Sequence, residues 1–322
     1  MDMLNWAINE LMVRKIVPIS APENVQDTEW SRVVQIGTNK GIVYLKKTPP
    51  TLSLEPRITA FLHDQLHESV PEIIAINNAM HCFLSFDCGV PLRKIFDGTL
   101  QPAVLAKGIK NYTAIQSVAV AHVDMLLDWG IPDWRLIKLP GLFRDLLNRD
   151  ALLIQDGLTT EELQTLETLV PLCKEQCDLL ATFGVSETLD HCDFHDNNMV
   201  MDASGRISII DWAECAITHP LFSLTTCLYA AQRRYKLEEN GSDYQLLQDA
   251  CLAGGLFSRC TSSEKLEMLR VAKMLSPVYA ALAQFRLLQS CSDDIELSNI
   301  SEQRRGRLAG ILRTYLKACQ SQ

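Results

Sequence analysis

The chain has 322 residues, of which 47% are hydrophobic and 21% charged, and its formal net charge is −9. This composition is typical of a globular protein with one large domain or two lobes, and it excludes a disordered chain. The acidic balance disfavours nucleic acid and anionic membranes as partners, and no apolar run is long enough to predict a transmembrane helix. Eleven scattered cysteines without a CxxC pair, and an N-terminus unlike a signal peptide, predict a reduced, cytoplasmic protein.

The first 90 residues alternate short β-branched or aromatic runs with turn residues, a pattern typical of strands. WSRVVQIGT and GIVYLKK are joined by turn residues and predict a β-hairpin. SLEPRITAFLHDQL has apolar residues at helical spacing. The predicted elements in chain order are strands over 13–20, 30–38 and 41–47, a helix over 53–66 with Ser53 as its N-cap, and strands over 72–77 and 81–87.

The spacing of apolar residues becomes helical from about residue 101 and stays so, with one interruption, towards the C-terminus. A Thr-x-x-Glu capping box at Thr159 and Glu162 predicts the start of one helix. The interruption over 199–211 predicts two short strands joined by an Asp-Ala-Ser-Gly turn. SCSDDIELSN, over 290–299, predicts a loop before a last helix.

The change from strand spacing to helical spacing predicts two lobes. Gly89 and Pro91 end the strand-rich part and place a linker near residues 87–91. The predicted fold class is therefore α+β, with a small antiparallel-sheet lobe over 1–88 and a larger helical lobe over 89–322. The helical lobe carries the embedded hairpin, directly after a polar loop.

That polar loop, HCDFHDNN, concentrates short polar side chains over residues 191–198. His191, Asp193 and His195 alternate, which would suit metal ligands on one face of a strand, but the cysteine pair typical of a zinc site is not nearby. A purely structural turn also fits the aspartate and asparagines. It does not account for Asp211, a carboxylate that ends an apolar strand and is costly to desolvate without a cationic partner.

A hairpin brings its two ends together, so the polar loop before it and the residue after it should meet. Asn198 and Asp211 flank the predicted hairpin, and Asp193 lies five residues before Asn198. Two carboxylates and an amide oxygen are hard ligands that suit Mg²⁺ rather than zinc. A site that holds Mg²⁺ and keeps a carboxylate to orient a hydroxyl is what phosphoryl transfer needs.

HCDFHDNN, with IIDW following at a spacing of thirteen residues between Asn198 and Asp211, resembles the catalytic loop and metal-binding aspartate of the aminoglycoside phosphotransferase and choline kinase group. The family pattern is His-Gly-Asp-Leu-His-x-x-Asn, then a strand that ends Ile-Asp-Trp. Cys192 and Phe194 stand where glycine and leucine are usual. The resemblance covers most of the chain and implies a bilobal protein-kinase-like fold.

The resemblance implies roles in chemistry and metal binding for the matching loop residues. Asp193 would orient the acceptor hydroxyl and accept its proton. Asn198 and Asp211 would hold Mg²⁺ against the phosphates. His191 and His195 would order the loop rather than transfer protons.

In the N-terminal lobe, IVYLKK resembles the strand that carries the ATP-binding lysine. Register favours Lys46 over Lys47, because adjacent residues on a strand face opposite sides. LEPRITAFL resembles the helix whose glutamate positions that lysine, and Glu55 would be this residue. Phe86 and Cys88 lie in FLSFDCG, where the hinge of the family meets adenine.

Two segments depart from the family pattern. SAPENVQDTEW, over 20–30, would face the phosphates, yet it has no glycine, and its carboxylates would repel phosphate if they turned inward. These carboxylates are Glu23, Asp27 and Glu29. THPLFSL places His219 and Ser223 where the group often has the two aspartates of Asp-Pro-x-x-Asp.

The sequence therefore predicts an ATP-dependent phosphotransferase that moves the γ-phosphate to a hydroxyl of an aminoglycoside, amino alcohol, sugar or related metabolite, with ATP and Mg²⁺ as cofactors. Two alternatives stay open: a nucleotide-binding pseudokinase with a regulatory role, and a metal-dependent hydrolase built on the two loop histidines and Asp193. The sequence does not indicate the oligomeric state.

The acceptor would be a small molecule bound by the helical lobe, with a cationic one among the candidates. Asp128, Asp133 and Glu214 would favour a cation, and Glu214 is also a candidate metal or substrate ligand. Three tryptophans would either supply an aromatic wall for a cation–π contact or belong to the core. They are Trp129, Trp134 and Trp212.

Overall fold

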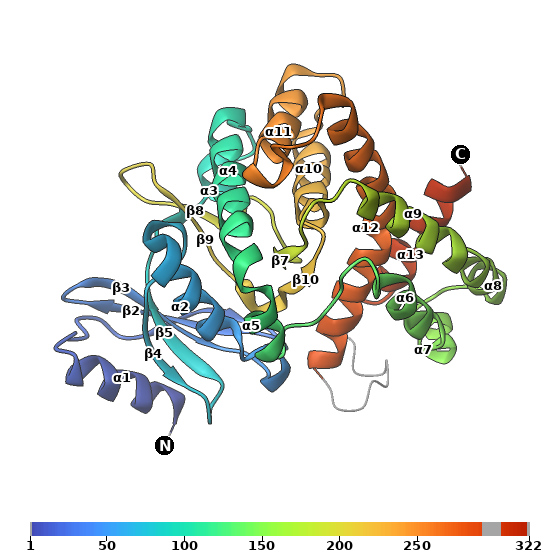
Figure 1. The fold of residues 1–322 in the computed structure, drawn as a ribbon. Coiled ribbons are helices and arrows are strands. Elements are labelled where there is room, and N and C mark those ends of the chain that lie inside the picture. Colours follow the sequence, from blue (N-terminus) through green and yellow to red (C-terminus); the bar gives the residue numbers. More distant parts are fainter. Residues whose placement is uncertain (1, 292–303, 321–322) are drawn as a thin grey trace. The chain divides into compact units, whose positions relative to one another are not determined.

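The structure is a computed structural model that describes residues 2–291 and 304–320, in two compact units. The first unit comprises the chain as far as Leu100 together with Asp196–Glu214, and the second comprises Gln101–His195 and the chain from Cys215 onwards. Figure 1 shows the sheet of the first unit in blue and the helices of the second from green to red. The predicted loop at 290–299 lies, apart from its first two residues, outside the described residues.

The first unit is built on a five-stranded antiparallel sheet in the order β1-β2-β3-β5-β4. A second sheet, β6-β8-β9, carries the hairpin that follows the polar loop. The strands are β1 Glu23–Asp27, β2 Arg32–Thr38, β3 Gly41–Lys47, β4 Ile73–Asn77, β5 Cys82–Phe86, β6 Val90–Pro91, β8 Met199–Met201 and β9 Ile207–Ile209. The helices are α1 Met3–Val13, α2 Glu55–Leu66 and α3 Leu92–Phe96, with short 3-10 turns at Pro50–Leu52, His67–Ser69 and Trp212–Glu214.

The two faces of β3 carry different kinds of side chains. Val43 and Leu45 are fully buried in a cluster with Trp6 and Leu11 of α1. Because side chains alternate along a strand, the residues between them face the opposite side. Helix α1 therefore packs against one face of the sheet, and the candidate site lies on the other face.

The predicted hairpins at 30–47 and 199–211 are confirmed, but the strand predicted over 13–20 is wrong. Residues up to Val13 belong to helix α1, and the segment after it makes only an isolated bridge between Pro18 and Thr38. Lys15 adopts a positive φ of 59°, which breaks an extended chain, and Pro18 has no N–H to donate. β-branched composition alone was a misleading signal here, because Val17 and Ile19 are exposed.

The segment expected to be a phosphate-facing loop forms edge strand β1, exposed along its whole length. An edge strand needs only backbone pairing on one side, so its polar side chains gave no strand signal. The predicted N-cap of α2 is also wrong. The helix begins at Glu55 after Leu54, and the hydroxyl of Ser53 donates to the carbonyl of Pro50 in the preceding turn at 2.6 Å.

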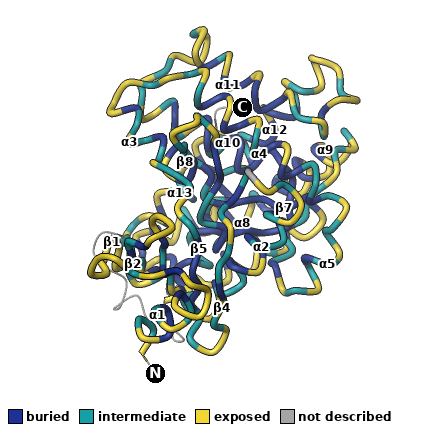
Figure 2. Tube along the Cα trace, turned by 90° about the vertical axis from the view of Figure 1, so that its left-hand side faces the viewer, coloured by how far each residue is buried: buried dark blue, intermediate teal, exposed yellow. Residues whose placement is uncertain are grey.

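The second unit is mainly helical, and its core lies along α10 and α12, which Figure 2 shows largely in the colour of buried residues. A short antiparallel pair, β7 with β10, carries the polar loop at its end. The helices are α4 Pro102–Ala119, α5 Val123–Asp128, α6 Leu139–Leu147, α7 Asp150–Gln155, α8 Thr160–Thr168, α9 Val170–Thr182, α10 Leu221–Tyr235, α11 Ser242–Leu252, α12 Ser262–Ser290 and α13 Arg307–Gln320. The strands are β7 Thr188–Asp190 and β10 Ala216–Thr218, and 3-10 turns span Val120–His122 and Gly255–Phe257.

The predicted capping box at the start of α8 is confirmed. The Thr159 hydroxyl accepts from the Glu162 N–H at 3.1 Å, and the Glu162 carboxylate accepts from the Thr159 N–H at 2.9 Å. The same carboxylate binds Arg313 of α13 at 2.6 and 2.8 Å. Asp156 accepts the N–H groups of Gly306 and Ala309 at 2.8 Å each. Asp156 therefore caps the start of the last helix, and Glu162 binds that helix through an ion pair with Arg313.

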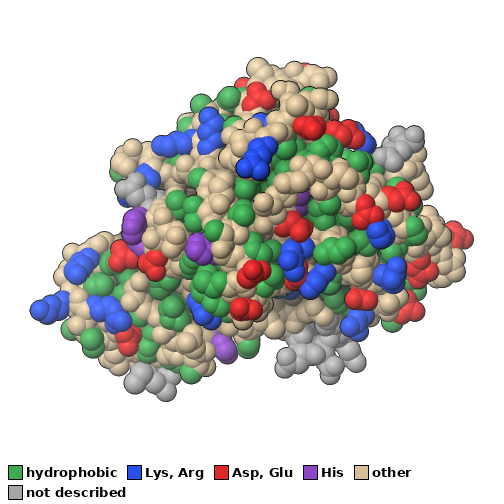
Figure 3. Space-filling model, viewed as in Figure 1, with side chains coloured by type: hydrophobic (Ala, Val, Ile, Leu, Met, Phe, Trp, Pro, Cys, Tyr) green, Lys and Arg blue, Asp and Glu red, His purple; other side chains and the backbone are tan. Residues whose placement is uncertain are grey.

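The predicted α+β class is confirmed, with an antiparallel sheet in the first unit and helices in the second. Figure 3 shows acidic and basic side chains interspersed on the face in view. Lys174–Asp178 and Arg270–Glu267 are ion pairs between exposed side chains within single helices. Within the described residues, no helix combines the length and apolarity that crossing a bilayer requires.

Candidate active site

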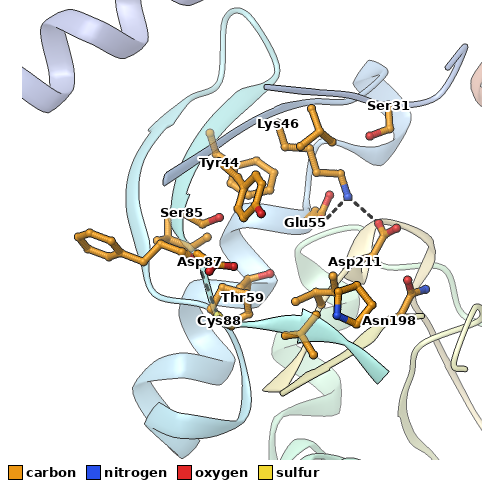
Figure 4. Close-up of a pocket in the computed structure, with 18 of the residues that line it drawn as sticks. Ser31, Tyr44, Lys46, Glu55, Thr59, Ser85, Asp87, Cys88, Asn198 and Asp211 are labelled. Atoms are coloured by element: carbon orange, nitrogen blue, oxygen red, sulfur yellow. Dashed lines mark hydrogen bonds and ion pairs between the residues drawn. The ribbon is translucent and has the colours of Figure 1, made fainter. Parts of the chain in front are cut away.

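A pocket in the first unit is lined by β3, β5, α2, the turn between β1 and β2, and the two ends of the β8–β9 hairpin. Figure 4 shows Tyr44 and Lys46 projecting into it from β3, with Asn198 and Asp211 opposite. Lys46 lies on the face predicted from strand alternation, whereas Lys47 is exposed. The fold thus brings together Lys46, Glu55, Asn198 and Asp211, four residues singled out from the sequence.

Lys46 is held by two carboxylates. Its ammonium donates to Glu55 Oε1 at 2.8 Å and to Asp211 Oδ1 at 2.6 Å. The Lys46 and Glu55 side chains are 12% and 4% exposed, and that of Asp211 is 42% exposed. The cationic partner that Asp211 was expected to need is therefore Lys46, which comes from a strand 165 residues earlier.

The pKa shifts of this cluster follow from burial and charge. Burial lowers the pKa of Lys46, but the opposing charges of Asp211 and then Glu55 outweigh it, so the pKa lies above its ordinary value. Burial raises the pKa of Glu55 to about 7, against the lowering effect of Lys46. Lys46 is thus a permanent cation that faces the pocket, fixed in place by a nearly buried acid.

Asn198 and Asp211 sit side by side at the open end of the hairpin. The pairing of Met199 with Ile209 is continued by a bond from the Ile210 N–H to the Asn198 carbonyl at 3.0 Å. Asp211 has a positive φ of 68°, a conformation that turns the chain sharply after the strand. Both side chains reach the pocket, as the hairpin argument predicted.

The start of the hairpin is anchored by Arg93 at the beginning of α3. Its guanidinium binds one oxygen of Asp196 at 2.7 and 3.0 Å, and its N–H donates to the Asp196 carbonyl at 3.1 Å. Asp196 is only 5% exposed, so this ion pair compensates a buried charge. The anchor holds the segment that leads to Asn198.

The donors at the hairpin end fit a magnesium ion. Asn198 and Asp211 offer amide and carboxylate oxygens, and Mg²⁺ is commonly held by one or two such side chains together with substrate phosphates. Among the described residues no group of three or more His, Cys, Asp or Glu side chains is placed to hold a metal ion. A zinc site formed by His191, Asp193 and His195 is therefore contradicted by the geometry.

Apolar and aromatic side chains also line the pocket. They include Tyr44 on β3 and Val200 and Ile210 of the hairpin segment. Phe86 and Cys88, the predicted hinge residues, also line the pocket. Burial, and then the charge of Asp87, raises the pKa of Cys88 to about 12, so this thiol stays protonated and unreactive.

None of the three carboxylates of the segment over 20–30 is among the pocket-lining residues. Gln26 and Ser31 line the pocket, whereas Glu23, Asp27 and Glu29 do not. A glycine-free turn closes because the Thr28 hydroxyl accepts from the Ser31 N–H at 3.1 Å. The Ser31 hydroxyl is buried and has no hydrogen-bond partner among the residues that the structure describes, so it could meet a polar ligand.

Residues 191–195 of the polar loop belong to the second unit. His191 is fully buried, and its N–H donates to the Tyr112 hydroxyl at 2.9 Å. Phe194 stacks on the Tyr112 ring with centroids 3.9 Å apart. Asp193 remains 46% exposed and lies 3.3 Å from His195 Nε2. The buried His191 and the stacked Phe194 hold the loop in place, and the carboxylate of Asp193 remains partly exposed to solvent. The convergence of Asp193 with Asn198 and Asp211 stays a prediction.

Cys192, where the family has glycine, adopts a positive φ of 66°. This left-handed conformation favours glycine, which accounts for the usual residue at this position. Cys192 is 7% exposed, so its side chain packs into the core and compensates part of the backbone strain.

The residues proposed for the acceptor have varied fates. Trp134 and Trp212 are buried core residues, and Trp212 donates to the Ile209 carbonyl at 3.1 Å. Asp133 binds Arg135 and Lys138 at 2.7 Å each, and the Arg135 hydrogen bond, more than Lys138, lowers its pKa. Its charge is therefore already neutralised. Half-buried Trp129 and exposed Asp128 stay candidates, and Glu214 lies half-buried in the turn after Asp211.

Sequence reasoning missed Tyr44, Ser31 and Asp190. Tyr44 could have been found, because it lies two residues before Lys46 and so shares its face of the strand. Asp190, described below, also ends a strand, but Leu189 is the only apolar residue of that strand, so the signal was weaker than that of Asp211. Ser31 gave no signal of its own, because its place in the pocket depends on the pairing of β1 with β2.

Solved structures with similar folds include small-molecule kinases. An ethanolamine kinase from Plasmodium vivax is 14% identical and superposes with a TM-score of 0.60 over 95% of this chain and 85% of that one. The choline kinase LicA from Streptococcus pneumoniae is 15% identical, with a TM-score of 0.60 over 97% and 99% of the two chains. The ADP-bound aminoglycoside phosphotransferase APH(2'')-Ib is 14% identical, with a TM-score of 0.54 over 97% and 98%. These likenesses confirm the predicted protein-kinase-like fold.

Comparison with curated protein sequences finds no match. The profile of the phosphotransferase enzyme family matches residues 26–249, which include the pocket strands, the catalytic loop and the hairpin. This match confirms the resemblance that the loop motif indicated. The chain therefore belongs to the phosphotransferase enzyme family, whose members are small-molecule kinases.

Proposed function

We propose that this protein transfers the γ-phosphate of ATP to a hydroxyl group of a small molecule. The observation that carries the proposal is one pocket in which Lys46, braced by Glu55, faces Asn198 and Asp211. A fixed cation beside hard oxygen ligands is the arrangement that nucleotide phosphates require. LicA has been solved with AMP and APH(2'')-Ib with ADP, which supports a nucleotide in the matching pocket of this chain.

The nucleotide would enter with its base against the apolar side chains of the pocket. Tyr44 would stack on one face of the adenine, while Val200 and Ile210 contact the other. The backbone between Phe86 and Cys88 would meet the edge of the base. The phosphates would then extend towards Lys46, where the ammonium and the Ser31 hydroxyl offer donors.

Asn198 and Asp211 would hold Mg²⁺, which neutralises the phosphate charge when bound. Asp193 would accept the proton of the acceptor hydroxyl as that oxygen attacks phosphorus, and His191 and His195 would keep the loop ordered. Lys46 would hold the phosphates in line for the attack, since catalysis of phosphoryl transfer is mainly positioning and electrostatic stabilisation.

The acceptor is proposed to be a small hydroxylated molecule, with aminoglycosides, amino alcohols and sugars as the classes to test. No disulfide occurs among the described residues, in keeping with a reducing cytoplasmic location. We propose that location because ATP and Mg²⁺ are at hand there.

The test is a screen of hydroxylated amines, sugars and aminoglycosides for acceptor-dependent ADP release, with Mg²⁺ present and then removed by chelation. We expect at least one class to stimulate release, and chelation to stop it. The phosphorylated product is then identified by mass spectrometry. Tight ATP binding without ADP release from any acceptor or from water would instead support a nucleotide-binding pseudokinase.

Removing the ring of Tyr44 is expected to weaken ATP binding. Loss of base stacking is worth about 1–3 kcal/mol, so Tyr44→Ala should raise the Kd for Mg·ATP roughly tenfold. Tyr44→Phe keeps the ring and should keep the affinity, since the hydroxyl makes only a long contact to Gln35 at 3.4 Å. Titration calorimetry measures both variants. Equal affinities of the wild type and the alanine variant would show that the adenine does not stack on Tyr44.

A further inference from the structure

A fully buried carboxylate lies directly before the catalytic loop. Asp190 ends strand β7 and has no exposed surface. Six donors from four parts of the second unit converge on its two oxygens. They are the hydroxyls of Ser223 and Tyr279, the Tyr112 hydroxyl at 3.3 Å, the Gln116 amide at 3.4 Å, the Ser223 N–H at 3.3 Å and the Cys192 N–H at 3.4 Å.

These donors also hold the loop backbone. The Ser223 hydroxyl donates to Asp190 and accepts from the Cys192 N–H at 3.0 Å. The Tyr112 hydroxyl likewise donates to Asp190 and accepts from the His191 N–H at 2.9 Å. Two consecutive backbone N–H groups before Asp193 are thus bound through hydroxyls that Asp190 orients. A free hydroxyl can rotate, but one that donates to a carboxylate presents its lone pair in one direction.

This anchoring matters because the loop is strained at Cys192. A residue other than glycine at a φ of 66° is strained, and this conformation persists only where its surroundings hold it. The bonds to Ser223 and Asp190 are made by the N–H of this same residue. The cluster therefore opposes relaxation of the backbone one residue before Asp193.

The cluster also accounts for a departure from the family pattern. Where the group often has two aspartates, this chain has His219 and Ser223. His219 is fully buried, and burial lowers its pKa to about 3, so it is neutral and supplies no negative charge. Ser223 is neutral as well. The carboxylate at this place comes instead from Asp190, whose oxygen accepts from the Ser223 hydroxyl.

We propose that Asp190 is a positioning residue for the catalytic loop, and that together with Ser223 it replaces the carboxylate that relatives carry at the position of Ser223. This inference rests on the proposed function, since it assigns Asp190 a role through Asp193. Asp190 does not touch the substrate; it acts by fixing the N–H groups of His191 and Cys192.

Keeping a charge at this depth is costly. Burial raises the pKa of Asp190, hydrogen bonds from Ser223 and Tyr279 offset part of this rise, and the resulting pKa is about 6. The six donors thus compensate part of the cost of a carboxylate in the core, whereas removing the carboxylate would leave several of them buried without an acceptor. The buried donors would need this acceptor even if Asp190 had only a structural role. The test must therefore separate an effect on stability from an effect on turnover.

The experiment is a double-variant cycle that moves the carboxylate. Asp190→Ser removes it, Ser223→Asp adds a second one, and the double variant Asp190→Ser/Ser223→Asp relocates it. Two readouts are used: amide hydrogen exchange in the peptide that spans His191 and Cys192, and steady-state ADP release with the best acceptor of the screen or with water. Asp156→Asn is the matched control, since Asp156 is also buried in the second unit but caps α13 instead.

In Asp190→Ser we expect the loop amides to exchange faster and kcat to fall about 100-fold, because small misplacement of a catalytic group has effects of this size. The KM for ATP should stay within about twofold, since the nucleotide pocket lies in the first unit. The relocated double variant should recover slow exchange and most of kcat. Asp156→Asn should lower Tm without changing kcat at temperatures where it is folded.

Several results would overturn the proposal. Loop exchange that is unchanged in Asp190→Ser would show that the carboxylate does not anchor the loop. Faster exchange with unchanged kcat would show that the anchor has no bearing on Asp193. A fall in kcat for Asp156→Asn equal to that for Asp190→Ser would reduce the effect to lost stability. If the wild type releases no ADP at all, the proposed function fails. Hydrogen exchange would still show whether Asp190 holds the backbone of the loop.

Discussion

Asp193→Asn is expected to lower turnover roughly 10³-fold while ATP binding stays at its wild-type value. Asparagine has the same shape but cannot accept the proton of an attacking hydroxyl. The Asp193 side chain is 46% exposed and lies 3.3 Å from His195 Nε2, so water screens its charge and we expect the fold to depend little on it. The measurement is ADP release with the best acceptor, beside calorimetric titration of Mg·ATP and the Tm of both proteins.

A matched control separates a catalytic loss from a general effect of removing a carboxylate. Asp178 on α9 is exposed and paired with Lys174, remote in role from the site, so Asp178→Asn should keep full turnover. Turnover by Asp193→Asn within tenfold of the wild type would remove Asp193 as the general base. A large fall in Tm for that variant would point to a structural role for the loop carboxylate.

Lys46→Met is expected to abolish ATP binding and to destabilise the first unit by about 3 kcal/mol at pH 8. Removing the cation leaves the Glu55 carboxylate, 4% exposed, without its 2.8 Å partner. Asp211 loses the same partner but is 42% exposed, so water screens most of its charge. Most of the loss in stability should therefore come from Glu55.

The pH dependence of this loss has a definite sign. In the wild type the pKa of Glu55 is raised to about 7 from an ordinary value of 4.5, so its contribution to stability is greatest below pH 4.5 and is lost as pH rises through 7. Without Lys46 the pKa of Glu55 rises further, because the opposing charge is gone. The destabilisation of Lys46→Met should thus be largest at pH 8 and shrink towards pH 5, where Glu55 takes up a proton.

Urea unfolding at pH 5 and pH 8 measures the effect, and two variants bracket it. Lys47→Met is the control, since Lys47 is exposed on the opposite face of β3 and should change the free energy of unfolding by less than about 0.5 kcal/mol. Lys46→Met/Glu55→Leu replaces the pair by apolar side chains and should recover stability but not ATP binding. A destabilisation that is the same at both pH values would show that it does not arise from the ionisation of Glu55.

Local patterns identified much of the candidate site. The alternation of IVYLKK selected Lys46 over Lys47, and the hairpin over 199–211 placed Asn198 beside Asp211. Both conclusions depend on neighbours in the chain, for which strand alternation and hairpin closure are reliable constraints. The capping box at Thr159 and Glu162 was readable for the same reason.

The errors came where a local pattern lacked its tertiary context. The run from Val13 to Ser20 has strand-like composition, but Ile16 is its only buried apolar residue and the chain turns at Lys15. Edge strand β1 has mostly polar, exposed side chains, and its conformation is set by backbone pairing with β2. Residue type alone carries little information about such pairing.

By itself, the sequence determined the chemistry present: a lysine, an acid to hold it, a pair of hard oxygen ligands and a loop carboxylate, because each lies in a short motif. Only the tertiary structure decided how buried charge is balanced. Asp211 meets Lys46 across 165 residues, and Asp190 meets Tyr279 across 89. The physical reason is that a desolvated carboxylate requires donors, but any donor that the fold brings within hydrogen-bonding distance will serve, and that distance is a property of packing rather than of spacing along the chain.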